Sequence, residues 1–200
     1  MMPGKLPHLR RALSWMVLTG LLMSVATAGA QQPPASPAVP VGTAPPAATV
    51  PRLEFAFEFR VTLAPATVLG ETPYGRRQYI PITGGVIAGP KFSGEIIPGG
   101  WDYQLGLPEG CGTLSADYFI RAKDGAVIHV LNEGFNCGLT GPDGQRSFFR
   151  PRFEAPKGPH DWLTRGTFVA TLELDRTAAP APGAPPGTLG AIRIKFYQVR

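Results

Sequence analysis

The sequence predicts an all-β domain of about ten strands behind a non-globular N-terminal segment. Apolar and polar residues alternate from residue 53 to residue 63, which is the period of a strand with one face in a core. Short candidate strands recur after it, separated by glycine, proline and Asp-Gly turns, and no stretch after Arg52 keeps the 3.6-residue period of a helix. These patterns alone predict either a closed barrel or a sandwich.

Residues 1–30 have the three parts of a secretory signal peptide: basic residues, an apolar run over residues 12–28, and small residues at the end. We expect cleavage after Ala30, with cleavage after Ala28 as the alternative. The apolar run of about 17 residues is shorter than the roughly 20 that a membrane-spanning helix needs, and an uncleaved anchor is the other interpretation. The mature protein is therefore expected to be periplasmic or secreted, with no stable membrane span.

Residues 31–51 are rich in Pro and Ala and contain no charged or aromatic residue, which predicts a disordered linker. The folded domain is then expected over residues 52–200. Cleavage would remove three of the nineteen Lys and Arg residues and none of the fourteen Asp and Glu residues, so the net charge falls from +5 to about +2. The remaining basic residues are interspersed with acidic ones, and we expect no nucleic-acid partner.

The other candidate strands follow the first at short intervals. They are residues 76–82, 86–88, 92–97, 101–107, 113–122, 126–135, 146–153, 167–174 and 191–199. Residues 177–188 are again rich in Pro, Ala and Gly, and we interpret them as a long surface loop inserted between two strands.

A hairpin is expected around Lys123-Asp124-Gly125, because a three-residue loop with glycine in the left-handed position is a common connection. This loop pairs Ala122 with Ala126 and places Cys111 directly opposite Cys137. The sequence therefore predicts a disulfide, worth about 3 to 4 kcal/mol by loop entropy. A two-residue Asp-Gly turn would spoil this alignment. A reactive or metal-binding pair is the rival interpretation, but no third ligand lies nearby in sequence.

The same register divides the hairpin into two faces. The inner face is predicted to carry Leu114, Ala116, Tyr118, Ile120, Ile128, Val130 and Asn132, and the outer face Ser115, Asp117, Arg121, His129 and Glu133. Tyr118 and Asn132 would then be polar groups inside the domain. They need a ligand, or they bond to each other, to the backbone or to a buried water.

Several phrases in the chain occur together in a known family. They are Tyr-Gly-Arg-Arg at residues 74–77, Pro-Ile-Thr-Gly-Gly at 81–85, Pro-Gly-Gly-Trp-Asp-Tyr at 98–103 and Pro-Arg-Phe-Glu at 151–154. Over nearly all of residues 52–200 the chain resembles the family called domain of unknown function 3237, or uncharacterised protein family 0311. The resemblance implies a compact antiparallel β-barrel and no established activity. With the strand pattern, it predicts a single antiparallel β-barrel of about ten strands, preceded by a signal peptide and a disordered Pro/Ala-rich linker.

The chain also departs from the family pattern. Ser115 and Asp117 replace the charged pair that the family strand often carries, and Thr164 stands where an Asn usually follows the Trp-Leu phrase. The segment before Pro151 is shifted in spacing, so no functional arginine is assigned to Arg150.

Asp102 is the first candidate catalytic residue, because a carboxyl group between Trp101 and Tyr103 at a barrel mouth could have a raised pKa and act as a general acid or base. The alternative is that Asp102 caps its turn or pairs with Arg76 or Arg77. These two arginines are adjacent in a strand and point to opposite faces, so at most one of them reaches a pocket.

Glu154 is the second candidate catalytic residue, and Trp162 is a candidate aromatic wall. With them, the candidate ligand-binding residues are Arg76, Arg77, Trp101, Tyr118, Asn132 and Trp162. The Gly-Gly pairs at 84–85 and 99–100 are interpreted as strand ends where the chain turns tightly or approaches another backbone, since no helix or Lys-Ser/Thr follows them as in a phosphate loop.

The usual hydrolase and metal motifs are absent from the sequence: there is no HExxH, no CxxC and no Gly-x-Ser-x-Gly. We therefore expect no metal and no cofactor. The leading functional hypothesis is an exported barrel that binds a small hydrophobic or aromatic molecule. The alternatives are a cofactor-independent isomerase or lyase with a carboxylate base, and a structural envelope protein with a packed barrel. The sequence predicts no oligomeric state.

Overall fold

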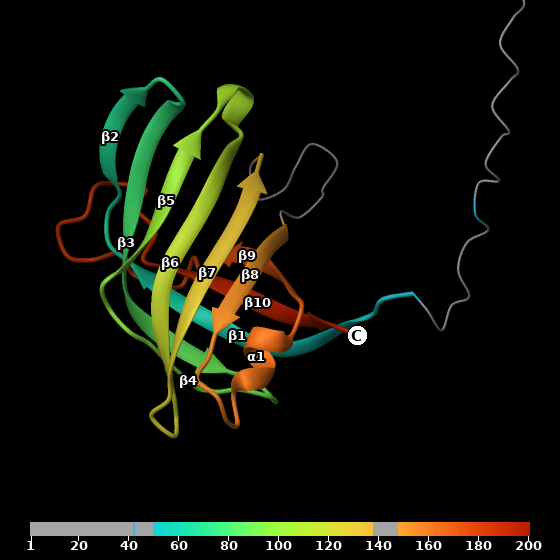
Figure 1. The fold of residues 1–200 in the computed structure, drawn as a ribbon. Helices are drawn as coiled ribbons and strands as arrows, with labels where there is room; N and C mark the ends of the chain where they lie inside the picture. Colours follow the sequence, from blue (N-terminus) through green and yellow to red (C-terminus); the bar gives the residue numbers. More distant parts are fainter. Residues whose placement is uncertain (1–41, 43–49, 138–147) are drawn as a thin grey trace, which may run out of the picture. The chain divides into compact units, whose positions relative to one another are not determined.

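The computed structural model describes residue 42, residues 50–137 and residues 148–200. The expected signal peptide and nearly all of the expected linker lie outside these residues. The described chain forms ten strands, one short helix and one 3₁₀ turn (Figure 1). In chain order they are β1 (Leu53–Leu63), β2 (Thr67–Thr72), β3 (Gly75–Ala88), β4 (Gly94–Ile96), β5 (Gly100–Gly106), η2 (Pro108–Gly110), β6 (Gly112–Ala122), β7 (Val127–Asn136), β8 (Phe148–Glu154), α1 (Asp161–Arg165), β9 (Phe168–Leu174) and β10 (Ala191–Val199).

All strands except β2 form one closed antiparallel barrel, in which β4 and β5 share one position, and this confirms the predicted all-β barrel class. Their order is β1-β10-β9-β8-β7-β6-β4-β3-β2, and β1 also pairs with β3 to close the barrel. β4 and β5 each pair with β3 on one side and with β6 on the other. These two short strands therefore lie one after the other between β3 and β6. β2 pairs with the first part of β3, at the barrel end where β5 finishes (Figure 1).

Two predicted strands are a single strand, β3, which continues through Gly84 and Gly85 and pairs there with β1, so the strand end and tight turn expected at this pair are wrong. Both glycines have positive φ, and a side chain at Gly85 would collide with the carbonyl oxygen of Arg60. β2 and α1 were not predicted. β2 has no buried face whose apolar residues would alternate, and five residues are too few for α1 to show a helical period.

The alternating pattern of β1 changes phase at a bulge between Phe55 and Phe57. Ala56 and Phe57 are both fully buried, whereas Phe55 is 40% exposed, although unbroken alternation predicts that Phe55 and Phe57 share a face. One extra residue in a bulge shifts the later residues to the other face of the strand. The prediction that Leu53 and Phe55 point into the core is therefore wrong.

Aromatic side chains fill the half of the barrel nearer α1. Phe57 lies at its centre, with its ring centroid 5.1 Å from that of Phe196, 5.4 Å from Phe59 and 5.6 Å from Phe92. Phe153 and Phe168 complete this group. Mainly aliphatic residues line the other half, and a small cavity lies there.

The β6–β7 hairpin has the predicted register. The Ala122 amide donates a 2.9 Å hydrogen bond to the Ala126 carbonyl, and Cys111 and Cys137 form a disulfide. The predicted inner face is also confirmed: Tyr118, Ile120, Ile128, Val130 and Asn132 are buried, while Leu114 and Ala116 pack partly buried against the core.

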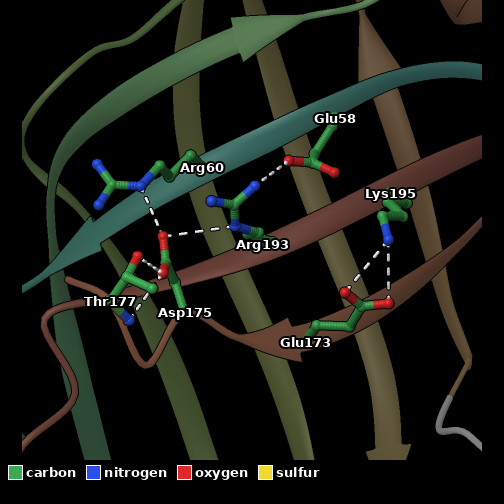
Figure 2. Close-up of polar contacts among 7 residues, drawn as sticks. All are labelled: Glu58, Arg60, Glu173, Asp175, Thr177, Arg193 and Lys195. Atoms are coloured by element: carbon green, nitrogen blue, oxygen red, sulfur yellow. Dashed lines mark hydrogen bonds and ion pairs between the residues drawn. The ribbon is translucent and has the colours of Figure 1, made fainter.

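A network of ion pairs covers the outer side of β1 and β10 beside the end of β9 (Figure 2). Arg60 Nε lies 2.7 Å and Arg193 Nε 3.5 Å from Asp175 Oδ2. Thr177 donates to Asp175 Oδ1 through both its hydroxyl and its amide. These hydrogen bonds, first those of Thr177 and then that of Arg60, hold the pKa of Asp175 far below its usual range. The network fixes the start of the segment that joins β9 to β10.

Within the described residues, no helix has the length and apolar character that a membrane crossing requires.

Candidate functional site

A pocket of about 380 Å³ opens at the barrel end where β5 finishes and β6 begins. We call it the mouth pocket; its lining includes Arg76, Gln78, Gln104, Cys111, Leu114 and Asn136. Arg76 and Gln78 share a face of β3 because strand side chains repeat every two residues. Gln104 lies directly opposite Gln78 in the β3–β5 pairing. Three polar side chains from two neighbouring strands therefore converge on one opening.

A smaller cavity of about 30 Å³ lies in the aliphatic half of the barrel and shares Leu114 with the mouth pocket. We call it the inner cavity. Its wall is apolar except for Asp102, Tyr118 and Asn132. Asp102 and Asn132 lie on opposite sides of Ala116 in the pairing of β5, β6 and β7. The small alanine leaves space between these two polar side chains.

Three buried oxygen atoms of the inner cavity have no hydrogen-bond partner within the described residues: Asp102 Oδ1, Tyr118 Oη and Asn132 Oδ1. Tyr118 is only 1% exposed and Asn132 only 3%. Buried polar groups in folded proteins are nearly always hydrogen-bonded, since an unpaired one costs about 1 to 3 kcal/mol. Tyr118 and Asn132 do not bond to each other here, so these atoms can bond to a buried water or to a small ligand group.

Two hydrogen bonds connect the mouth pocket to Asp102. Gln78 Nε2 donates to Gln104 Oε1 at 2.8 Å, and Gln104 Nε2 donates to Asp102 Oδ2 at 2.7 Å. Burial raises the pKa of Asp102, although the hydrogen bonds from Gln104 and from the Ser115 backbone oppose this shift. Burial, and then the charge of Asp102, also raise the pKa of Tyr118. This environment favours a neutral carboxylic acid and a neutral phenol at the inner cavity.

Four of the residues singled out from the sequence lie at this end of the barrel. Asp102, Tyr118 and Asn132 line the inner cavity, and Arg76 lines the mouth pocket. The hydrogen bond to Asp102 comes from Gln104 rather than from either arginine. Asp102 is thus a member of a polar cluster and not half of an ion pair.

Two ligand-binding candidates lie on the outer surface of the barrel. Arg77 points away from the mouth pocket, with its guanidinium carbon 4.7 Å from the centre of the Tyr103 ring. Trp101 is 49% exposed, because it precedes the inward-facing Asp102 and so faces outward.

The other two candidates are also remote from the inner cavity. Glu154 has an 84% exposed side chain on the outer face, with Oε2 4.0 Å from His129 Nδ1. Trp162 packs in the aromatic half, where its ring centroid lies 6.4 Å from that of Phe57 and 5.8 Å from that of Phe168. The structure does not bring these residues to Asp102.

Sequence reasoning missed Gln78 and Gln104. Each stands two residues from a candidate, Gln78 from Arg76 and Gln104 from Asp102, so strand periodicity would have placed them on the inward faces. The contact between Gln78 and Gln104 could not be predicted from the sequence, because the two residues are 26 positions apart and meet only when β3 pairs with β5.

Among the residues that the structure describes, no group of three or more His, Cys, Asp or Glu side chains is arranged to hold a metal ion.

Comparisons with known proteins agree with this architecture. The chain matches the family described as Protein of unknown function (DUF3237) over residues 51–199. A UPF0311 protein of Clostridium acetobutylicum is 34% identical over 132 residues, which cover 58% of this chain and 82% of that protein. The crystal structure of a conserved protein of unknown function from Rhodopseudomonas palustris aligns with a TM-score of 0.62 and 28% identity, covering 76% of this chain and 99% of that one.

One relative carries the name of an activity. A hydroalkoxylation enzyme of Penicillium herquei is 38% identical over 84 residues, which cover 41% of this chain and 54% of that enzyme.

Proposed function

We propose that this chain, which belongs to the DUF3237 family of proteins of unknown function, binds a small and mainly apolar molecule in the mouth pocket and inserts one polar group of it into the inner cavity. The observation that carries the proposal is the set of three buried, unpartnered oxygen atoms on Asp102, Tyr118 and Asn132. A ligand group that forms hydrogen bonds to these oxygen atoms would replace the hydrogen bonds to water that they lose on burial.

The sizes of the two spaces support this placement of the ligand. The mouth pocket, at about 380 Å³, is within the usual range of about 300 to 1,000 Å³ for small-molecule sites. The inner cavity, at about 30 Å³, has room for a water or a single small group, since a water needs at least about 10 to 15 Å³. The body of the ligand therefore occupies the mouth pocket.

A second candidate function is cofactor-independent acid–base catalysis, which is favoured by the raised pKa of Asp102 and by the name of the Penicillium relative. Hydroalkoxylation adds the O–H bond of an alcohol across a carbon–carbon double bond and gives an ether. The neutral Asp102 carboxyl would give its proton to one alkene carbon while the substrate hydroxyl oxygen forms a bond to the other carbon. The hydroxyl proton then returns to the Asp102 carboxylate, so the residue is regenerated.

Native mass spectrometry of the protein purified without denaturation, followed by thermal-shift screening against small phenols, alcohols and aliphatic acids, tests the binding proposal. We expect a retained small molecule or a concentration-dependent rise in melting temperature. Tyr118→Phe should reduce that rise, whereas the outer-surface control Glu154→Gln should not. An empty protein that responds to no compound would contradict binding and favour a packed structural barrel.

Asp102→Asn separates binding from catalysis once a ligand is known. A catalytic role predicts that turnover collapses while the ligand still binds, because the amide keeps the size of the carboxyl but has no acidic proton. Unchanged turnover would exclude Asp102 as the acid.

We include export to the periplasm or the exterior in the proposal. The signal-peptide pattern of residues 1–30 supports it, and the Cys111–Cys137 disulfide is compatible with an oxidising compartment. Cell fractionation with an antibody to the barrel tests this location. Recovery in the cytoplasmic fraction with reduced cysteines would overturn it.

A further inference from the structure

We infer that Gln78 and Gln104 direct the proton of the neutral Asp102 carboxyl group to Oδ1, so that the inner cavity presents two donors and one acceptor and selects a ligand by its hydroxyl group. The inference rests on the proposed binding function and specifies the chemical class of the ligand as a small alcohol or phenol. It also assigns Gln78 and Gln104 as positioning residues.

The first step is the orientation of the Gln104 amide. Its Oε1 accepts from Gln78 Nε2 at 2.8 Å, which leaves its Nε2 directed at Asp102 Oδ2, 2.7 Å away. Because a donor already faces Oδ2, a proton on that oxygen would oppose the Gln104 N–H. The proton of the neutral acid is therefore carried by Oδ1, the oxygen that lines the inner cavity and lacks a partner within the described residues.

The second step is the count of donors and acceptors around the inner cavity. Asp102 Oδ1 and Tyr118 Oη each offer an O–H group, and Asn132 Oδ1 offers lone pairs. The group complementary to two donors and one acceptor has two lone pairs and one hydrogen. A single hydroxyl group has this set, whereas an ether has no hydrogen to donate and an ammonium group has no lone pair.

The third step is fit. A hydroxyl is small enough for a cavity of about 30 Å³, and the carbon skeleton that carries it would lie in the mouth pocket beside Leu105 and Leu114. Arg76, Gln78 and Gln104 also line the mouth pocket and would lie beside this skeleton.

Titration of the Asp102 carboxyl carbon by nuclear magnetic resonance tests the positioning role in the ligand-free protein. Gln104→Leu removes a donor that stabilises the carboxylate, so the pKa of Asp102 should rise further. Gln78→Leu should raise the pKa of Asp102 by less, because Gln104 would lose the hydrogen bond that orients it but could still donate to Asp102. Gln198→Leu, which changes a buried amide bonded to Lys91, is the control and should leave Asp102 unchanged. A fall or no change with Gln104→Leu would overturn the positioning role.

Three probes of similar size, phenol, anisole and toluene, test the ligand class. Phenol should raise the melting temperature at concentrations roughly tenfold lower than the other two, since one or two buried hydrogen bonds distinguish them. Tyr118→Phe and Asn132→Leu should each reduce this preference. Equal binding of all three probes would overturn the hydroxyl selection and leave the binding function standing. No response to any of the three probes would overturn both the hydroxyl selection and the binding function. The titration of Asp102 would then still test the positioning role of Gln104.

Discussion

Arg60 Nε lies 2.7 Å from Asp175 Oδ2, and this contact joins the middle of β1 to the first residue after β9. The side chain of Asp175 is almost completely buried, and Arg193 and Thr177 also contact it (Figure 2). A buried carboxylate needs such partners, because removing a charge from water is costly.

Asp175→Asn should lower the stability of the barrel at neutral pH. The pKa of Asp175 is lower in the folded protein than in the unfolded chain, so its contribution is complete above the unfolded pKa of about 3.9 and is lost as pH falls toward the folded-state value. Urea denaturation of both proteins at pH 7 and pH 3 measures this, and the difference between them should shrink at pH 3. Glu173→Gln, at the more exposed pair with Lys195, is the control and should cost about 1 kcal/mol or less.

Replacement of both Cys111 and Cys137 by serine should cost about 3 to 4 kcal/mol, as expected for a cross-link spanning 26 residues. Urea denaturation with and without reductant measures the effect. Reductant should destabilise the native protein by a similar amount and leave the double-serine variant unchanged. Because Cys111 lines the mouth pocket, loss of the disulfide should also weaken ligand binding there. Equal stability with and without reductant would contradict this prediction.

Gly100→Ala should destabilise the barrel by about 1 to 3 kcal/mol, since the new methyl group would collide with Tyr118 Cβ. The collision would also displace the Tyr118 hydroxyl from the inner cavity. Gly106→Ala is a matched control in the same strand, because its methyl group would meet only ordinary contacts near Arg76 at 3.5 Å or more. Chemical denaturation of the two variants should separate them clearly.

Asp102→Asn should make the barrel more stable at neutral pH, opposite to the effect at Asp175. Burial raises the pKa of Asp102 in the folded protein, so the folded state loses stability as pH rises above the unfolded pKa of about 3.9 and through the folded-state pKa. The gain in melting temperature should therefore be larger at pH 7 than at pH 4. Asp117→Asn, at an exposed pair with His129 on the outer face, should show no such gain. A lower melting temperature for Asp102→Asn at pH 7 would show that the carboxylate stabilises the fold.

The contrast between the β6–β7 hairpin and β1 explains what could be predicted. The three-residue turn at Lys123-Asp124-Gly125 sets the hairpin register locally, so the inner face and the disulfide followed from short-range sequence. The bulge between Phe55 and Phe57 arises where β1 pairs with β10, far along the chain. Alternation within β1 contains no sign of that extra residue.

The candidate site shows the same division. Hairpin register predicted Tyr118 and Asn132 as inward polar residues, and the preceding turn suggested Asp102 at a barrel mouth. The structure places all three around one cavity. Residue type alone suggested Glu154 as an acid and Trp162 as an aromatic wall, and they lie on the outer face and in the aromatic half. Residue type and local pattern cannot distinguish these positions, because each is defined by what packs across the barrel.

By itself, the sequence determined the β-rich class, the hairpin register and the pairing of Cys111 with Cys137, since turn chemistry and a two-residue period act over short distances. Only the tertiary structure decided how β1 closes onto β3, which barrel end is filled by phenylalanine side chains, and how Gln78 and Gln104 reach Asp102. These features depend on strands that are distant in the chain. Their contacts form only when the whole barrel closes and the volumes of facing side chains must fit together.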